Sequence, residues 1–230
     1  RAFQCLNNHA QLARAWRMYA DDNNDKLANN MHGLGEPTPT LPMWAIGWLD
    51  WSSSSANTNK LYLSDPRYSA LARYCSKDAR LFKCPADQYI SPPQRLYGWK
   101  ERVRSVSENL YVGESNVESG PTDPAYYDHV RKWTGLVNPK PAETWLSLDE
   151  HPDSINDGGF LPPTTTTLVD VPANYHDGGA GVAYADGRAE IHRWEGRVLR
   201  LPITFNFNNM TPVPANDPDL LWLRYHTDRK

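Results

Sequence analysis

The first twenty residues carry the clearest pattern of hydrophobic and polar positions in the chain. Apolar side chains recur there every three or four residues, at Phe3, Leu6, Ala10, Ala13 and Trp16, with Leu12 and Tyr19 widening the stripe. This spacing predicts an amphipathic helix over residues 2–20. We expect it to end at "DDNNDK", because Asp and Asn side chains compete with the helical backbone for hydrogen bonds. A helix with one apolar face needs a cover, which predicts that it packs on a sheet.

Residues 21–80 show no sustained period, and they are predicted to be loops with one short helix. The segment "MWAIGWLDW" fits either a helical face or a strand followed by a loop. The segment "DPRYSALARYCS" predicts a short helix, with Asp65 as its N-cap and Pro66 at its first helical position.

From residue 81 the pattern changes to short alternating runs that predict β-strands. These runs are "RLFKC", "RVRSVSENLYVG", "TWLSLDE", "GAGVAYAD" and "RAEIHRW", and Pro- and Gly-rich loops separate them. Residues 81–204 are therefore expected to form an antiparallel sheet region. Residues 205–230 form a C-terminal extension in which "DLLWLRYH" fits a short helix or an edge strand. The order of elements predicts a single α+β domain over residues 1–230.

The stretch "YHDGGAGVAYADGRAEIHRW" predicts a β-hairpin. Alternating runs lie on either side of Asp186-Gly187, a pair that favours a type I′ turn with positive φ at both central residues. The glycines before it lead into a strand pattern and not into a helix. A phosphate-binding glycine loop needs a helix N-terminus at that point, so this function is excluded.

Composition narrows the class of protein. The chain has 230 residues, of which 40% are hydrophobic and 11% aromatic, so a globular domain is expected. A net charge of −3 gives no basic face, and nucleic acid is not an expected partner. No apolar run reaches the roughly 20 residues that span a membrane. Because the chain begins within a helical pattern and without Met, we expect that a preceding segment has been removed.

His176, nine further residues and then Asp186-Gly187 resemble the prepilin-type processing-associated domain, a family defined by that spacing. The similarity extends to further elements in the same order, covering most of residues 5–194: "CLNNHAQLARAWRMYADDNNDKL", "LFKCPAD", "RVRSVSENLYVG" and "WLSLDEHPDSINDGGF". The resemblance implies a pilin-like fold, in which the C-terminal half of a long helix packs on an antiparallel sheet with long loops.

The same resemblance implies a function in assembly and not in catalysis. It points to a pseudopilin-like subunit of a type II secretion or type IV pilus-like fibre, which acts in protein transport. Such a subunit faces the periplasm and is anchored in the inner membrane by an apolar N-terminal half-helix that a prepilin peptidase processes. Its implied partners are other pilin-like subunits and the secretion machinery.

An acidic loop follows the predicted strand "TWLSLDE". Five side chains with oxygen donors lie within nine residues, at Asp149, Glu150, Asp153, Asn156 and Asp157. Calcium takes six to eight oxygens in flexible geometry, so this loop is a candidate calcium site, and the resemblance to pseudopilins favours it. The spacing is not that of an EF-hand. The alternative is a set of side-chain-capped turns in a surface loop.

Three histidines of the C-terminal region, at positions 151, 176 and 192, are candidates for a catalytic site with Asp186. No Ser or Cys nucleophile stands in a recognisable elbow motif. We therefore expect His176 to be a structural residue that is hydrogen-bonded to the hairpin backbone.

The tryptophans of "MWAIGWLDW" suggest a second function. Exposed Trp44, Trp48 or Trp51 would offer flat faces for sugar rings, which makes a carbohydrate- or polysaccharide-binding protein on a pilin-like frame the alternative hypothesis. Packing in the core is the favoured role for these side chains, because large aromatic residues contribute much buried area.

The three cysteines leave the pairing open. Cys75 and Cys84 are close enough in sequence for a disulfide, Cys5–Cys84 is a second pairing, and free buried thiols are a third alternative. The chain has no C-x-x-C and no cysteine–histidine spacing of the usual kind. From spacing alone, no structural zinc site is expected.

Overall fold

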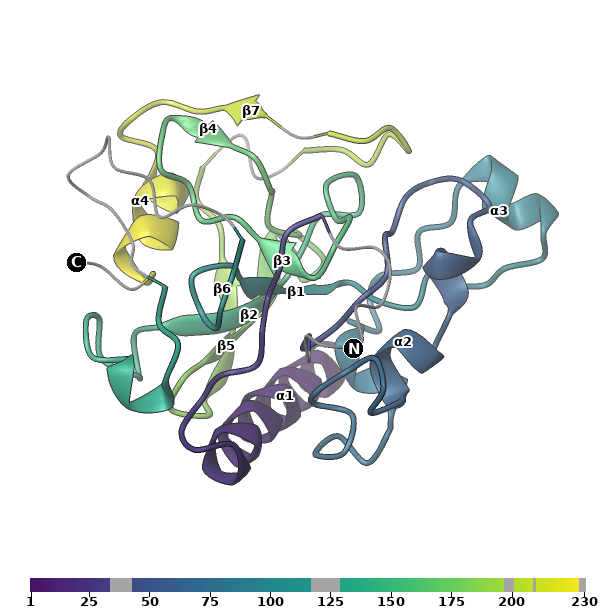
Figure 1. Cartoon of the computed structure of the whole chain (residues 1–230). Helices are drawn as coiled ribbons and strands as arrows, with labels where there is room; N and C mark the ends of the chain where they lie inside the picture. Colours follow the sequence, from purple (N-terminus) through teal and green to yellow (C-terminus); the bar gives the residue numbers. More distant parts are fainter. Residues whose placement is uncertain (34–42, 117–128, 197–200, 209, 228–230) are drawn as a thin grey trace.

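One long helix packs against a mostly antiparallel sheet (Figure 1). The computed structural model describes residues 1–33, 43–116, 129–196, 201–208 and 210–227. Helix α1 (Ala2–Asp22) contacts the sheet strands β2, β5 and β6. The chain therefore has a mixed α+β architecture.

The main sheet has five strands in the order β3-β1-β2-β5-β6. They are β1 (Val106–Asn109), β2 (Trp145–Asp149), β3 (Gly159–Phe160), β5 (Gly179–Tyr184) and β6 (Ala189–Arg193). Every neighbouring pair is antiparallel except β1 and β3. A separate two-stranded sheet pairs β4 (Thr167–Leu168) with β7 (Thr211–Pro212).

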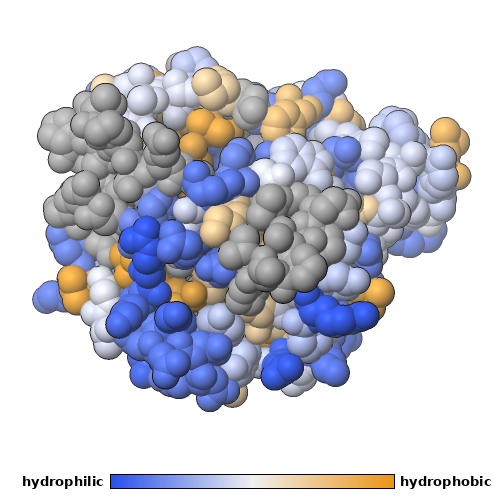
Figure 2. Space-filling view, viewed as in Figure 1, coloured by the Kyte–Doolittle hydropathy of each residue, from blue (hydrophilic) through white to orange (hydrophobic). Residues whose placement is uncertain are grey.

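Short helices lie along the rest of the described chain, which otherwise consists of turns and loops. They are η1 (Ser55–Thr58), α2 (Leu61–Ser64), η2 (Ala79–Phe82), α3 (Pro92–Leu96), η3 (Trp133–Gly135) and α4 (Pro218–Tyr225). A capping box between Ser91 and Gln94 starts α3, which lies at one edge of the molecule. In the same view, the projection at the right where α3 lies ends in hydrophobic atoms (Figure 2).

The alternation of side chains along the strands supplies two hydrophobic clusters. In β5, Ala183 belongs to the cluster that contains the α1 residues, whereas Val182 and Tyr184 belong to the cluster that contains Leu220 of α4. Because side chains alternate along a strand, Gly181 lies on the same face of β5 as Ala183, toward α1. The absence of a side chain at Gly181 lets the helix approach this end of the strand closely, because a Cβ atom there would meet Cys5 and His9 of α1.

The structure confirms several predicted elements. The predicted helix over residues 2–20 is α1, and four of the predicted strands contain β1, β2, β5 and β6. The end of the chain, for which a helix and an edge strand were both open, forms α4. Described helices include none that is long and apolar enough to cross a membrane.

Two predicted elements are wrong. The run "RLFKC", expected to be a strand, forms the 3-10 helix η2, whose N-cap Asp78 accepts a hydrogen bond from the Arg80 amide. Residues 65–76, expected to be a helix, form successive turns, and Asp65 follows the end of α2. In both places local capping and packing outweigh the periodicity of a short segment.

The predicted hairpin exists, but its turn differs from the expected type. Gly187 has a φ of +90°, whereas Asp186 is not among the residues with positive φ, so both requirements of a type I′ turn are not met. The Gly187 amide donates to the Tyr184 carbonyl, and the Tyr184 amide donates to the Arg188 carbonyl. This is a three-residue loop in which the glycine takes the left-handed position.

The buried face of α1 also differs from the predicted stripe at its first turns. Phe3, expected on the buried face, is 84% exposed. Cys5, Asn8 and His9 are buried there instead, so polar side chains take the place of apolar ones at this end of the helix.

Candidate metal centre

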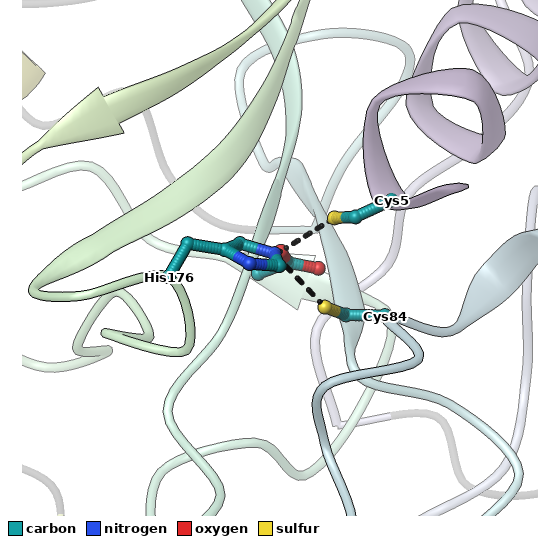
Figure 3. Close-up of side chains that lie close together, drawn as sticks. Cys5, Cys84 and His176 are labelled. Carbon is teal, nitrogen blue, oxygen red and sulfur yellow. Dashed lines mark hydrogen bonds and ion pairs between the residues drawn. The ribbon is translucent and has the colours of Figure 1, made fainter. Parts of the chain in front are cut away.

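Four side chains from distant parts of the chain converge between α1 and the sheet (Figure 3). Cys5 comes from the first turns of α1, Cys84 from the segment after η2, Asp149 from the end of β2, and His176 from the loop before β5. One ligand atom from each of the four lies within 4.8 Å of the other three. In the described part of the chain, no other group of three or more His, Cys, Asp and Glu side chains is brought together in this way.

The separations between the ligand atoms fit a small cation. The distance from Cys5 Sγ to Asp149 Oδ2 is 3.1 Å, from Cys84 Sγ to His176 Nε2 it is 3.2 Å, and from His176 Nε2 to Asp149 Oδ2 it is 3.9 Å. In a tetrahedral zinc site with bonds of about 2.0–2.3 Å, neighbouring ligand atoms are about 3.3–3.8 Å apart. These three separations lie within a few tenths of an ångström of that range, and the other three are at most 4.8 Å.

The centre is closed to solvent on most sides. Cys5, Cys84 and Asp149 are at most 1% exposed, and the His176 side chain is 7% exposed. Four protein ligands without an open position are typical of structural zinc sites, whereas catalytic sites keep one position for water or substrate.

Neighbouring groups hold the Asp149 carboxylate in place. Its Oδ1 lies 3.2 Å from His9 Nε2, and His9 Nδ1 lies 3.2 Å from Ser147 Oγ. The amide of Gly181 donates to Asp149 Oδ2 at 2.9 Å. Such outer contacts orient metal ligands and adjust their basicity.

Gly181 leaves the space that the centre occupies. A Cβ atom at this position would lie 2.7 Å from Cys5 Sγ and 2.6 Å from His9 Cδ2. Its φ does not lie in the left-handed region, so turn geometry does not account for this glycine. The close approach of α1 accounts for the glycine at this position.

The charges and hydrogen bonds of the centre shift the pKa values of its four groups in different directions. A hydrogen bond with Cys5 lowers the pKa of the Cys84 thiol to about 7 against the effect of burial, and His176 acts in the same direction. The interaction with Cys84 raises the pKa of His176. Burial opposes ionisation of Asp149, yet the charge and hydrogen bond of His9 outweigh it and lower the pKa of this carboxyl. Cys84 and Asp149 are therefore favoured in the thiolate and carboxylate forms that bind cations. The hydrogen bond with Cys84 and burial raise the pKa of the Cys5 thiol far above its usual value, so Cys5 and a protonated His176 would release protons when an ion binds.

The donor set selects the kind of ion. Two sulfurs, one imidazole nitrogen and one carboxylate oxygen suit zinc and similar transition metals, whereas calcium and magnesium take oxygen ligands.

No family model, curated protein or solved structure matches this chain. The role of the centre is therefore inferred from its own chemistry.

The acidic loop that was predicted to bind calcium does not point its oxygens at one spot. Asp149 belongs to the centre above, and Glu150 bonds to Ser107 and, at 2.7 Å, to Ser154. Asp153 accepts from Trp51 and Thr204, the Asn156 side chain from the Asp157 amide, and Asp157 from Gly33 and Gly159. These groups are buried and tie separate loops together, whereas the alternative expected capped turns in a surface loop. Calcium binding stays a prediction without support from this geometry.

The candidate catalytic histidines and Asp186 have separate surroundings. Asp186 is exposed at the hairpin tip, where it caps the Arg188 amide. His151 contacts the Leu201 carbonyl, and His192 stacks on Trp222 with ring centroids 3.9 Å apart. The His176 ring contacts Cys84 and not the hairpin backbone, although its amide donates to the Gly179 carbonyl.

The three candidate sugar-binding tryptophans do not form one exposed face. Trp44 is fully buried and stacks on Phe82. Trp51 is half-buried, donates to Asp153 and carries the Arg102 guanidinium 3.9 Å above its ring. Trp48 alone of the three is exposed, at 39%.

Of the three alternatives for the cysteines, the structure shows free buried thiols. The possible Cys75–Cys84 disulfide is not formed, and Cys75 packs in the hydrophobic cluster of α1. Cys84 instead faces Cys5, its alternative partner in the sequence. The sequence offered one signal for the centre: Cys5 and His9 are four residues apart on a helix, so they share a face. That signal was weak, because the other three ligands lie 79 or more residues away from Cys5.

Proposed function

We propose that this chain is the globular domain of a pilin-like, non-enzymatic structural subunit whose N-terminal helix is fastened to its sheet by a zinc ion. One observation carries the proposal. The segments that resemble the prepilin-type processing-associated family supply the four ligands: the helix gives Cys5, "LFKCPAD" gives Cys84, "WLSLDEHPDSINDGGF" gives Asp149, and the His/Asp-Gly signature gives His176. In this proposal the signature histidine is a metal ligand.

The position of the centre explains why a structural subunit would need it. The first turns of α1 bury polar side chains and have little apolar area with which to hold the sheet. A metal ion that bridges α1, β2 and two loops would supply that attachment, since metal binding contributes directly to folding free energy. A fibre subunit whose helix connects it to its neighbours has to transmit force through this junction.

The setting follows from the same resemblance. The subunit would face the periplasm and be anchored in the inner membrane by an apolar helix preceding residue 1. Its partners would be other pilin-like subunits and secretion machinery. A helix packed on a mostly antiparallel sheet is the arrangement that a pilin-like subunit requires.

Metal analysis and thermal unfolding test the centre. Purified protein should contain one equivalent of zinc, and a chelator should lower its melting temperature. At free zinc 100 times above its dissociation constant, binding to the folded state alone adds about 2.7 kcal/mol. Cobalt in place of zinc should give the intense absorption of thiolate-to-metal charge transfer.

Cys84→Ala and Cys75→Ala form a matched pair, because both thiols are buried but only Cys84 lies in the centre. Cys84→Ala should lose the zinc and the response to chelator, whereas Cys75→Ala should keep both. Wild-type protein that holds no zinc and melts identically with and without chelator would refute the metal centre.

The subunit function has a separate test. Sequencing the mature N-terminus of the full-length protein should find an apolar helix that continues into α1. An ordinary cleaved signal peptide directly before residue 1, with the protein released from the membrane, would refute fibre assembly and leave the metal centre untouched.

A further inference from the structure

A cleft of about 800 Å³ opens beside the first turns of α1, on a part of the molecule that the metal centre does not use. Gln4 and Asn8 of α1 line one wall, η2 and the following segment line another, and residues 99–103 close it. This volume lies in the range of pockets that hold small organic ligands.

The inner wall of the cleft is preorganised. The side-chain amide of Asn8 donates to the carbonyls of Arg80 and Lys83, at 3.2 and 2.9 Å. Lys83 Nζ pairs with Asp87 Oδ2 at 3.0 Å, and these two side chains are 9% and 0% exposed. A ligand would meet a wall whose polar groups are already fixed, which lowers the cost of binding.

The outer part of the cleft is basic, although the whole chain carries a net charge of −3. Its lining has four basic side chains, Lys60, Arg80, Lys83 and Lys100, against the two acidic side chains Asp87 and Glu101. Arg80 pairs with Asp78 and Lys83 with Asp87. Lys60 and Lys100 are exposed and make no ion pair with any described residue, so they are available to an anionic ligand. The exposed Glu101 is also without an ion pair in the described chain, which leaves an excess of one positive charge among these three groups.

One wall also carries a large aromatic ring. Trp99 lines the cleft half-buried, and the Tyr97 ring lies tilted against it with centroids 6.0 Å apart. An indole presents a flat apolar face on which the C–H groups of a sugar ring can pack. The amides of Gln4 and Gln88 add hydrogen-bonding groups for hydroxyls at the rim.

We propose that this cleft binds an anionic oligosaccharide, with a sugar ring against Trp99 and its carboxylates near Lys60 and Lys100. A neutral sugar would leave the two ammonium groups unused. An acidic peptide would share the charge complementarity, but it gains less from a single flat ring set among amides. Binding here needs no metal-dependent chemistry.

Calorimetric titration of the zinc-loaded protein with a short oligogalacturonate tests the proposal. Maltotriose serves as the neutral sugar and an oligoglutamate of similar length as the acidic peptide. Oligogalacturonate should bind, with an affinity that falls as salt is added. Maltotriose and oligoglutamate should bind at least tenfold more weakly.

Trp99→Ala should weaken oligogalacturonate binding about tenfold, and the double variant Lys60→Ala/Lys100→Ala should weaken it and flatten its salt dependence. Trp48→Ala and Lys140→Ala are matched controls, because both side chains are exposed and neither lines the cleft. Absence of oligogalacturonate binding, or binding that the cleft variants leave unchanged, would overturn the proposal. Preference for oligoglutamate would replace the saccharide with a peptide ligand. Neither result would bear on the metal centre or on fibre assembly.

Discussion

The two halves of α1 are held against the sheet by different forces. The C-terminal half buries Leu12, Trp16 and neighbouring apolar side chains in a large hydrophobic cluster. The N-terminal half buries Cys5, Asn8 and His9, whose contacts are hydrogen bonds and candidate metal bonds. Hydrophobic attachment is non-directional and tolerates small movements, whereas polar attachment depends on each partner being in place. Apolar packing alone can therefore hold the C-terminal half of α1 against the sheet, whereas we expect the attachment of the N-terminal half to depend on a bound ion.

The largest effect should come from the apolar half. Leu12→Ala removes a side chain that is 1% exposed and should lower the free energy of unfolding by about 2–5 kcal/mol. Urea unfolding with and without chelator measures this loss, which should be the same in both conditions. Phe3→Ala is the matched change at the other end, where the side chain is 84% exposed, and should cost less than about 0.5 kcal/mol. A costly Phe3→Ala would mean that the apolar attachment extends to the first turn.

The next largest loss of stability should come from a methyl group added on β5, opposite the polar half of α1. Gly181→Ala places a Cβ against Cys5 and His9, and crowding of this kind costs about 1–3 kcal/mol. Because the same atom displaces a ligand, the zinc content should fall as well, as metal analysis would show. In chelated protein, adding Cys5→Ala should recover part of the lost stability by removing the contact with the sulfur. Full zinc retention in Gly181→Ala would show that the centre is less crowded than its geometry indicates.

A third effect separates the halves by pH. Glu108 is fully buried beneath the apolar half, and burial raises the pKa of this carboxyl well above its usual value, with the Trp16 indole only partly opposing the shift. Its neutral form is therefore compatible with folding at low pH. The associated stability is lost as the pH rises from the unfolded pKa through the folded pKa.

Glu108→Gln imitates the neutral carboxyl. It should differ least from the wild type at pH 5 and exceed its stability at pH 9, because the folded wild type must then either keep a proton that the unfolded chain has lost or bury a charge. Each pH unit by which the folded pKa of Glu108 exceeds the unfolded pKa contributes about 1.4 kcal/mol to this difference. Thermal melts at the two pH values would measure the difference, and other titrating groups cancel between the two proteins. Equal stability of the two proteins at both pH values would mean that folding does not raise the pKa of Glu108.

The sequence predicts the fold where periodicity is long or where a turn pair is distinctive. The helix over residues 2–20 and the hairpin around Asp186-Gly187 illustrate the two cases. Short segments carry too few residues to define a period, and "RLFKC" contributes to the 3-10 helix η2 because Asp78 caps it. The pattern of apolar residues also predicts that Phe3 is buried, because periodicity does not show which turns of a helix the sheet covers.

The candidate centre was harder to predict than the fold. Local motif rules look for ligands a few residues apart, but Cys5 and Cys84 lie on segments that only tertiary packing brings together. The spacing argument against zinc considers only ligands that are close in sequence, so it does not address a cluster of this kind. The sequence marks His176 as a signature residue and Cys84 as a possible partner in a disulfide, which does not form. Their proximity is a property of the folded sheet and not of either motif.

The spread of the four ligands along the chain has a consequence for the order of folding. Because His176 is the last ligand, a growing chain that stops before this residue cannot complete the centre. Contacts between such distant segments form late, after the loops between them have paid their closure entropy. Metal occupancy would then act as a completion signal: a chain that has captured its ion has already brought helix, sheet and loops together.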